Sequence, residues 1–384
     1  MQTLSDTPRR LPSLDILRGL TVALMILVNN PGSWSHKFDF LAHSAWDGCT
    51  PTDLVFPFFL FIVGASVWFA FRRYDHRLSG QALRKIVRRG LTIWAVGIVI
   101  SKFPYYNFLS GEWIAWHNVR IMGVLPRIGL CYMIGSVLVL GLRSTRRIAA
   151  AALLLLAAYE AMVYALGDAT LEGFFGAKVD TALLGEEHLY HGYRNAAGER
   201  MAFDPEGLMS TMSAVVNVLL GFLAAKCIGQ SGDHRCGMMR IGVWGGIGVL
   251  AALALNTVIP INKPIWSGTY VLYTCGIAAI VWNAVSYLTD RRSGTGKAGR
   301  VFEVFGTNAL LAYVLSTLFA KIFAQMRVWN AAHDALVSPY ARWYEILASC
   351  TSPQVGSMLC ALSLVVLCWL VTWPLYRKRI YIKL

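Results

Sequence analysis

Charged residues are scarce in this chain. Asp, Glu, Lys and Arg together make up 15% of its 384 residues, against 56% hydrophobic residues and a mean hydropathy of +0.51. A soluble protein of this size would carry more charge and shorter apolar runs. The sequence also lacks a Ser/Gly-rich linker and any polar segment long enough for a soluble domain. These absences favour a single integral membrane domain over residues 1–384.

Metal-binding cysteine patterns are also lacking. The eight cysteines form no C-x-x-C motif and no Cys/His spacing, so we expect no metal site. A disulfide between Cys49 and Cys350 remains open, because both are expected on the oxidising side of the membrane. No small-residue cleavage site follows Arg9 and Arg10, so we expect the first apolar run to be an uncleaved anchor.

The chain contains repeated apolar stretches of roughly 20 residues, each long enough to cross a bilayer as a helix. We therefore expect an all-α, polytopic membrane protein with ten spans. The third span is the weakest of them, because it is short and ends at Pro104. The expected spans are residues 14–31, 54–71, 90–106, 120–142, 147–167, 208–229, 240–259, 268–288, 302–324 and 357–376.

Basic residues gather in alternate connections. Seven follow the second span, against the single acid Asp75: Arg72, Arg73, Arg77, Arg84, Lys85, Arg88 and Arg89. The loop 168–206 instead has eight acids and three bases. The positive-inside rule then places both termini in the cytoplasm and His43 on the outer face. Cytoplasmic loops beside anionic lipid explain the net charge of +14, so no nucleic-acid partner is implied.

Some ionisable residues fall inside the spans, where they are costly unless paired or functional. Asp15 and Arg18 lie three residues apart on one helical face, as an ion pair or as an anchor for a charged substrate. Arg120 and Arg127 are seven apart, so we expect them to share a helical face, and we expect Arg127 to pair with Glu160. A guanidinium at Arg120, beside an aromatic rim, suits recognition of phosphate, sulfate or carboxylate.

Two further segments carry polar groups. Asn262, Lys263 and Trp266 lie in a turn with two prolines, which is either a structural turn or part of an outer-face site. Asp204 is interpreted as the N-cap of the sixth span. Asn308, in the ninth span, either lines the inner half of a cavity or bonds helix to helix.

Several of these runs, in this order, resemble the transmembrane acetyltransferases typified by heparan-α-glucosaminide N-acetyltransferase. The most specific is the block from His43 to Pro57, His-x-x-Trp-x-Gly followed by Asp-Leu-Val-Phe-Pro. The others are residues 14–19, 28–29, 119–127, 204–207, 262–263 with 266–267, and 376–378.

The resemblance implies transfer of an acetyl group from cytosolic acetyl-CoA to an acceptor amine across the membrane. The family's active-site histidine falls on His43 and its nearby asparagine on Asn29. Asp47 stands where the eukaryotic enzymes have asparagine, and the extra N-terminal luminal domain is not found in this sequence, so the heparan substrate is not implied. A bacterial inner-membrane location and a homodimer are expectations of the same kind.

The resulting hypothesis divides the candidate residues between the two faces. Asp15, Arg18 and Asn308 lie toward the cytoplasmic mouth, while Asn29, His43, Asp53, Arg120 and Lys263 surround the reacting carbonyl and the acceptor. The remaining expected substrate-binding residues are Trp46, Asp47, Arg127, Asn262 and Trp266. In this hypothesis Asp53 orients the ring of His43 and Asn29 donates to the oxyanion.

Alternatives remain at two levels. His43 acts either as the general base for an amino-sugar acceptor or as the acetyl carrier. The rival functions are a permease for a small anionic solute and an O-acetyltransferase acting on a cell-envelope glycan.

Overall fold

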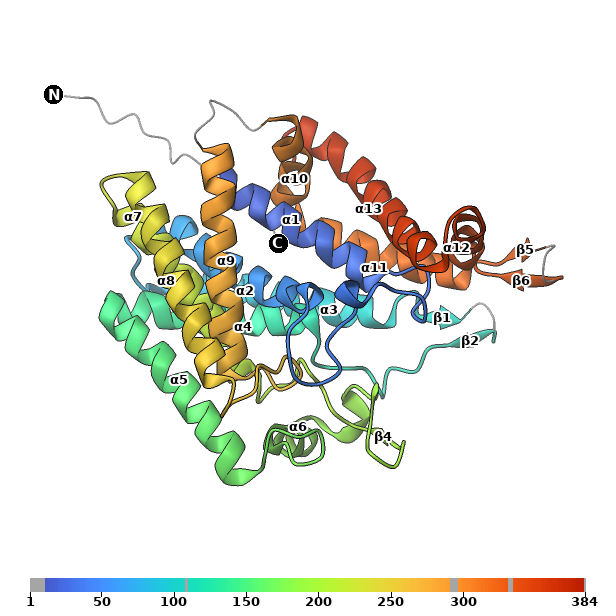
Figure 1. The fold of residues 1–384 in the computed structure, drawn as a ribbon, viewed down its shortest axis with the longest axis horizontal. Helices are drawn as coiled ribbons and strands as arrows, with labels where there is room; N and C mark the ends of the chain where they lie inside the picture. The colour runs from blue at the N-terminus through green and yellow to red at the C-terminus, as the bar shows by residue number, and fades with distance from the viewer. Residues whose placement is uncertain (1–10, 108–109, 291–295, 331–333, 383–384) are drawn as a thin grey trace.

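The computed structural model describes residues 11–107, 110–290, 296–330 and 334–382, and the basic residues Arg9 and Arg10 lie outside them. The fold is mostly helical (Figure 1). Its long helices are α1 (Pro12–Asn29), α2 (Val55–Ala70), α3 (Gly80–Lys102), α4 (Val124–Leu142), α5 (Thr145–Leu166), α7 (Thr211–Gln230), α8 (His234–Leu255), α9 (Gly268–Thr289), α11 (Ala309–Gln325) and α13 (Pro353–Arg377).

Eight helices in the described part of the chain are long and apolar enough to cross a membrane, or nine if the bent pair α10 (Lys297–Thr307) and α11 is one span. The expected third span is not among them. It belongs to α3, whose first half carries Arg84, Lys85, Arg88 and Arg89. These charges offset the apolar second half, so the expected count of ten spans is not confirmed.

The expected span 302–324 is broken. α10 and α11 meet at Asn308 with a bend of 80°. The Asn308 amide donates to the carbonyl of Ile380 (3.1 Å), and its oxygen accepts from the N–H of Ile382 (2.9 Å). Asn308 therefore holds the end of the chain at a helix break, which a continuous apolar pattern does not reveal.

Close backbone contact joins α10 to α1. A Cβ added to Gly19 would lie 1.7 Å from the carbonyl oxygen of Phe302, and one added to Gly306 would lie 1.8 Å from that of Asp15. Glycine at both positions is what lets the two helices meet at this distance.

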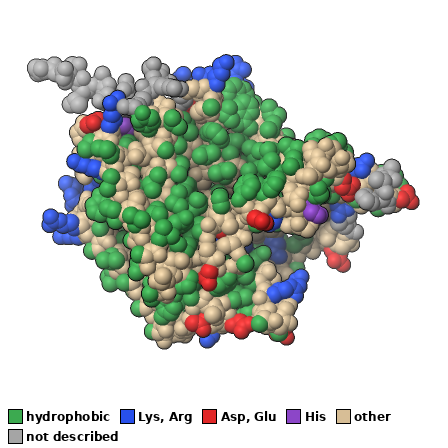
Figure 2. Space-filling model, in the orientation of Figure 1, with side chains coloured by type: hydrophobic (Ala, Val, Ile, Leu, Met, Phe, Trp, Pro, Cys, Tyr) green, Lys and Arg blue, Asp and Glu red, His purple; other side chains and the backbone are tan. Residues whose placement is uncertain are grey.

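Helix α2 lies at the centre of the bundle and packs closely on α7. Its residues are apolar on every side. Within Pro51–Ala70, 72% of the 18-residue stretch that could span a membrane is buried, as expected of a central helix. The outer helix α8 is the opposite, with large exposed side chains at Val243, Trp244 and Leu250. Apolar side chains cover much of the face shown in Figure 2, and charged ones gather near its edges. This distribution is that of an integral membrane protein.

The polar connections at one end of the bundle carry His43, and we call it the His43 end. It comprises the loop 30–54, the loop 167–210 and the loop 256–267, together with the hairpins β1–β2 (Tyr106–Asn107, Glu112–Trp113) and β5–β6 (Val328–Asn330, Ala335–Val337). Within 167–210 lie the helix α6 (Phe175–Leu184) and the hairpin β3–β4 (Tyr193–Arg194, Arg200–Met201). The short helix α12 (Pro339–Cys350) packs beside α13 at the same end (Figure 1).

Candidate active site

His43, Asp53 and Lys263 meet at the His43 end. The Nδ1 atom of His43 lies 2.6 Å from Oδ1 of Asp53. Lys263 Nζ lies 3.2 Å from the same oxygen and 2.9 Å from His43 Nδ1. The three side chains differ in exposure, at 47% for His43, 16% for Lys263 and 0% for Asp53. A buried carboxylate thus holds an imidazole whose other side is open to an incoming molecule.

Local backbone geometry fixes Asp53. The short 3-10 helix Pro51–Leu54 begins after Thr50, and its capping box places the Asp53 carboxylate on the backbone of that turn. Asp53 Oδ2 accepts from the N–H groups of Thr50 (3.0 Å) and Ser44 (3.1 Å). Tyr270 of α9 donates its hydroxyl to the Asp53 carbonyl at 2.6 Å. These bonds leave Oδ1 for His43 and Lys263.

Lys263 reaches this position because its loop is tied to the His43 loop. Asn262 donates its amide to Asp47 Oδ1 at 3.0 Å, and Gly48 donates its N–H to the Ile261 carbonyl at 2.7 Å. The carboxylate of Glu160 accepts from the N–H of Gly268 at the other end of the loop. Asp47 and Asn262 therefore have a structural contact that joins the two loops.

Trp46 connects the His43 loop to the long loop 167–210. Its indole N–H donates to the Ala169 carbonyl at 2.9 Å. Its ring packs against Tyr193 and Phe203, with centroid distances of 6.1 and 5.6 Å. The long loop thus lies directly beside His43 rather than free in solvent.

Arg120 differs from its expected arrangement. It precedes α4 instead of sharing a helical face with Arg127, because α4 begins only at Val124. Its guanidinium donates to both oxygens of Asp204 (2.8 and 2.5 Å) and to Glu206 Oε2 (2.6 Å). The anions that Arg120 binds in this structure are carboxylates of this chain, and its expected role in binding substrate stays a prediction.

The charge states in this cluster follow from the pairing. Burial lowers the pKa of Arg120, but Asp204 and Glu206 outweigh it and hold the pKa above its ordinary value. Burial raises the pKa of Glu206, while Arg120, Arg127 and Lys263 lower it and prevail. The contribution of Lys263 shows that this cluster and the His43 site lie within electrostatic reach of each other.

Asp204 and Glu206 are the residues that sequence reasoning missed. Asp204 was expected to cap the sixth span, but α7 begins at Thr211 and Asp204 binds Arg120 instead. The Asp-Pro-Glu spacing was the available signal, because it sets two carboxylates two residues apart near the start of a span.

Arg127 and Glu160 do not pair. Arg127, fully buried, donates to the Gly207 carbonyl (2.8 Å) and to the Ser210 hydroxyl, and its guanidinium lies 4.9 Å from the centre of the Trp266 ring. Glu160 binds the start of α9, as described above. Matching depth along two helices was therefore insufficient to predict a partner. Trp266 is also buried, and its indole N–H donates to Asn217 at 3.0 Å.

At the opposite end, Asp15 and Arg18 form the expected pair, at 2.7 Å. Arg18 also donates to the Gly306 carbonyl (3.0 Å) and to Ser66 (2.8 Å). The Asp15–Arg18 pair thus joins three helices, α1, α2 and α10. Both side chains are partly exposed, at 14% and 21%.

Asn29 and the cysteines make fewer contacts. Asn29 is exposed at the end of α1, and within the described residues it has no hydrogen bond to His43. Cys49 and Cys350 are both free thiols, so the open question of a disulfide is answered against it. Burial raises the pKa of Cys49 to about 12, which makes it a poor nucleophile at neutral pH.

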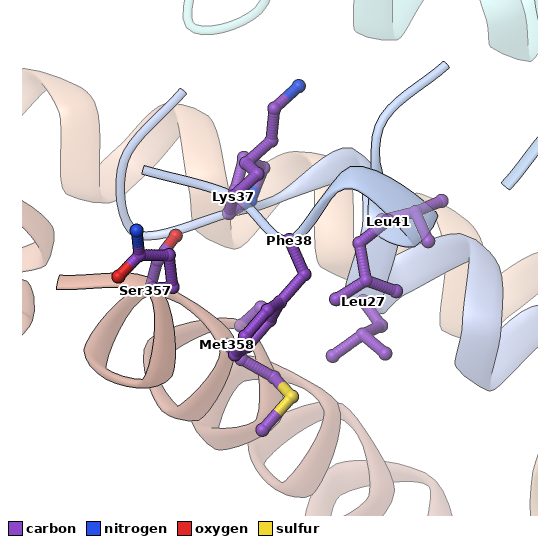
Figure 3. A pocket seen from close by; sticks show the side chains of 10 residues that line it. Leu27, Lys37, Phe38, Leu41, Ser357 and Met358 are labelled. Carbon is purple, nitrogen blue, oxygen red and sulfur yellow. The ribbon is translucent and has the colours of Figure 1, made fainter. Parts of the chain in front are cut away.

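A shallow groove lies elsewhere at the same end, between α1, the loop 31–41 and the start of α13 (Figure 3). It is lined mainly by apolar side chains, among them Leu27, Phe38 and Met358, with Lys37 at its edge. None of the candidate catalytic residues lines it. The groove is therefore separate from the cluster of His43, Asp53 and Lys263.

Comparison with known proteins agrees with the motifs. Residues 10–177 match a family model described as heparan-alpha-glucosaminide N-acetyltransferase, catalytic. The chain is 29% identical over 370 residues to the human enzyme of that name, covering 83% of this chain and 54% of the human protein. It is 29% identical over 363 residues to the mouse enzyme, covering 82% and 54%. The chain thus spans about half the length of these relatives, and it is similar to the heparan-alpha-glucosaminide N-acetyltransferases over most of its own length, with His43, Asp53 and Arg120 inside the matched catalytic segment.

Proposed function

We propose that this protein is a transmembrane acetyltransferase that moves an acetyl group from acetyl-CoA to an amino-sugar acceptor at the His43 end. The observation that carries the proposal is the 2.6 Å contact between His43 and the buried Asp53. We assign the proton of the neutral ring to Nδ1, which then donates to the ionised Asp53 carboxylate beside Lys263 and leaves the lone pair on Nε2. A neutral imidazole oriented in this way is equipped to take a proton or an acyl group.

As a general base, His43 Nε2 removes a proton from the acceptor amine as its nitrogen attacks the thioester carbonyl. The tetrahedral intermediate then expels the CoA thiolate, which takes that proton from the imidazolium. As an acetyl carrier, Nε2 itself attacks and expels the CoA thiolate, which takes the Nδ1 proton; the amine later displaces the imidazole, which takes up the proton that the amine loses. We favour the first route, because an exposed ring in an open loop leaves room for both substrates at once.

Lys263 is placed to assist either route. Its ammonium lies 3.4 Å from His43 Nε2, where negative charge develops on the carbonyl oxygen during attack. We propose Lys263 as an oxyanion-stabilising group and retain Asn29 as a second donor that turns toward the carbonyl when substrate is bound.

The two ends of the bundle supply the two substrates in this proposal. The basic connections at the end opposite His43 face the cytoplasm of a bacterial inner membrane, where acetyl-CoA carries its negative charges. Asp15 and Arg18 lie at that mouth, and the uncharged pantetheine arm extends through the bundle toward His43.

The test uses purified protein in nanodiscs, with acetyl-CoA and glucosamine as probes. Release of CoA thiol together with N-acetylglucosamine, detected by mass spectrometry, is the expected result. The broken pair α10–α11 favours a permease as the second candidate, because discontinuous helices form substrate sites in transporters. Solute uptake into vesicles with no CoA release would reject the acetyltransferase and support that candidate.

A further inference from the structure

Glu206 is the surplus carboxylate of the Arg120 cluster. Asp204 binds the guanidinium through both of its oxygens, and Glu206 adds a third hydrogen bond through Oε2. The other oxygen of Glu206, Oε1, makes no hydrogen bond within the described part of the chain. The Asp204 side chain is fully buried, whereas the Glu206 side chain is 12% exposed. Glu206 therefore retains a free acceptor oxygen on a side chain that is nearly, but not fully, buried.

Two tyrosines stand beside this carboxylate. The guanidinium of Arg120 lies 4.9 Å from the centre of the Tyr190 ring, and the Tyr190 ring lies 6.2 Å from that of Tyr193. Tyr190 is 42% exposed, and Tyr193 continues the aromatic surface to Trp46. Aromatic faces attract cations and pack against the apolar faces of sugar rings.

This surface adjoins the reacting imidazole. Lys263 contacts His43 and also lowers the pKa of Glu206. Burial, Glu206 and Tyr190 raise the pKa of Tyr193, and Asp53 adds to them. Tyr193 packs on Trp46 of the His43 loop and on Tyr190 beside Arg120, so its ring connects the His43 loop to the Arg120 cluster.

The local charge favours a cation. The four carboxylates of Asp47, Asp53, Asp204 and Glu206 outnumber the three cations that act on this group, Lys263, Arg120 and Arg127, by one. A site with this balance attracts an ammonium group and repels a sulfated or otherwise polyanionic sugar.

We propose that Glu206, with the faces of Tyr190 and Tyr193, forms the acceptor subsite and selects a cationic amino sugar that lacks anionic substituents. This inference rests on the proposed function. Glu206 accepts hydrogen bonds from the ammonium of the arriving sugar, and the ammonium gives one proton to solvent to become the attacking amine. The sugar ring packs on the tyrosines, which leaves its amine directed toward His43.

The test compares Glu206→Gln with Glu186→Gln, which neutralises an exposed acid in the same loop. Glucosamine and glucosamine 6-sulfate are the probes. For Glu206→Gln we expect the KM for glucosamine to rise about tenfold, as for one lost charge-assisted hydrogen bond. The KM for acetyl-CoA is expected to stay within about twofold. In the wild type we expect a lower KM for glucosamine than for glucosamine 6-sulfate. The ratio of these two KM values should become smaller in Glu206→Gln and stay unchanged in Glu186→Gln.

Tyr190→Leu provides a second variant in case Glu206→Gln unfolds, because Tyr190 is exposed and its loss leaves the ion pairs intact. It should also raise the KM for glucosamine. Binding of glucosamine, followed by saturation-transfer NMR, separates this inference from the proposed function, since it needs no turnover. Weaker binding in both variants supports the subsite even if no acetyl transfer occurs. Wild-type binding and KM in both variants, or a preference for the sulfated sugar, would overturn it.

Discussion

Loss of the Arg120 guanidinium should destabilise the protein strongly. Arg120→Met removes three charge-assisted hydrogen bonds and leaves the fully buried Asp204 and the nearly buried Glu206 without their cation. Removing one partner of a buried ion pair costs about 3–5 kcal/mol, because the remaining charge is uncompensated. That is a large share of the 5–15 kcal/mol by which a domain is typically stable. For a chain of 384 residues we expect the melting temperature to fall by roughly 4–6 °C.

Thermal unfolding in detergent micelles, followed by tryptophan fluorescence, measures this effect. Arg194→Met is the matched control, because Arg194 is an exposed arginine of the loop 167–210, which also carries Asp204 and Glu206, and its guanidinium donates to the Gly198 carbonyl rather than to a carboxylate. It should change stability by less than about 0.5 kcal/mol. Adding Asp204→Asn to Arg120→Met should recover part of the loss, since it removes one uncompensated charge. Equal melting temperatures for Arg120→Met and Arg194→Met would refute the reasoning.

Three further predictions concern charge and packing. Burial raises the pKa of Asp180 from 3.8 to about 6, so the stability associated with its neutral form is present below pH 3.8 and lost as the pH rises through about 6. Asp180→Asn should therefore gain stability over wild type as the pH rises from 4 to 7, by at most about 3 kcal/mol, and parallel unfolding curves at both pH values would contradict this. Lys263→Met should slow acetyl transfer by about 10- to 100-fold with little change in the KM for acetyl-CoA, measured by CoA release. Gly306→Ala should destabilise the fold by about 1–3 kcal/mol because its Cβ meets Asp15, whereas Gly246→Ala, which has open space, should not; equal unfolding midpoints would argue against the α1–α10 contact.

The fold was predictable where the membrane alone determines the sequence. An apolar run of about 20 residues must form its backbone hydrogen bonds internally, so nearly every expected span corresponds to a helix. The break at Asn308 was not predictable in this way. At the break, Asn308 bonds to Ile380 and Ile382, which lie more than 70 positions away. The hydropathy of the segment itself does not indicate such a contact.

In the candidate site, too, local contacts were predictable from the sequence and long-range contacts were not. The contact between His43 and Asp53 spans ten residues and follows from one loop and one short helix, so local spacing suggested it correctly. Lys263 is 220 residues from His43, and Arg120 is 84 residues from Asp204. Such pairings depend on how helices pack, which the charge pattern of single segments does not specify. The expected Arg127–Glu160 pair was wrong for this reason.

The most direct test of the central claim is acetyl transfer by His43→Ala, measured as N-acetylglucosamine formed from acetyl-CoA in nanodiscs, beside binding of acetyl-CoA to the same sample. His36→Ala is the matched control, because His36 is an exposed histidine of the same loop that contacts Ser33 and Tyr344 and not Asp53. The account predicts that His43→Ala binds acetyl-CoA but loses at least about 100-fold in transfer rate, while His36→Ala retains it. Transfer by His43→Ala at the wild-type rate would contradict the account.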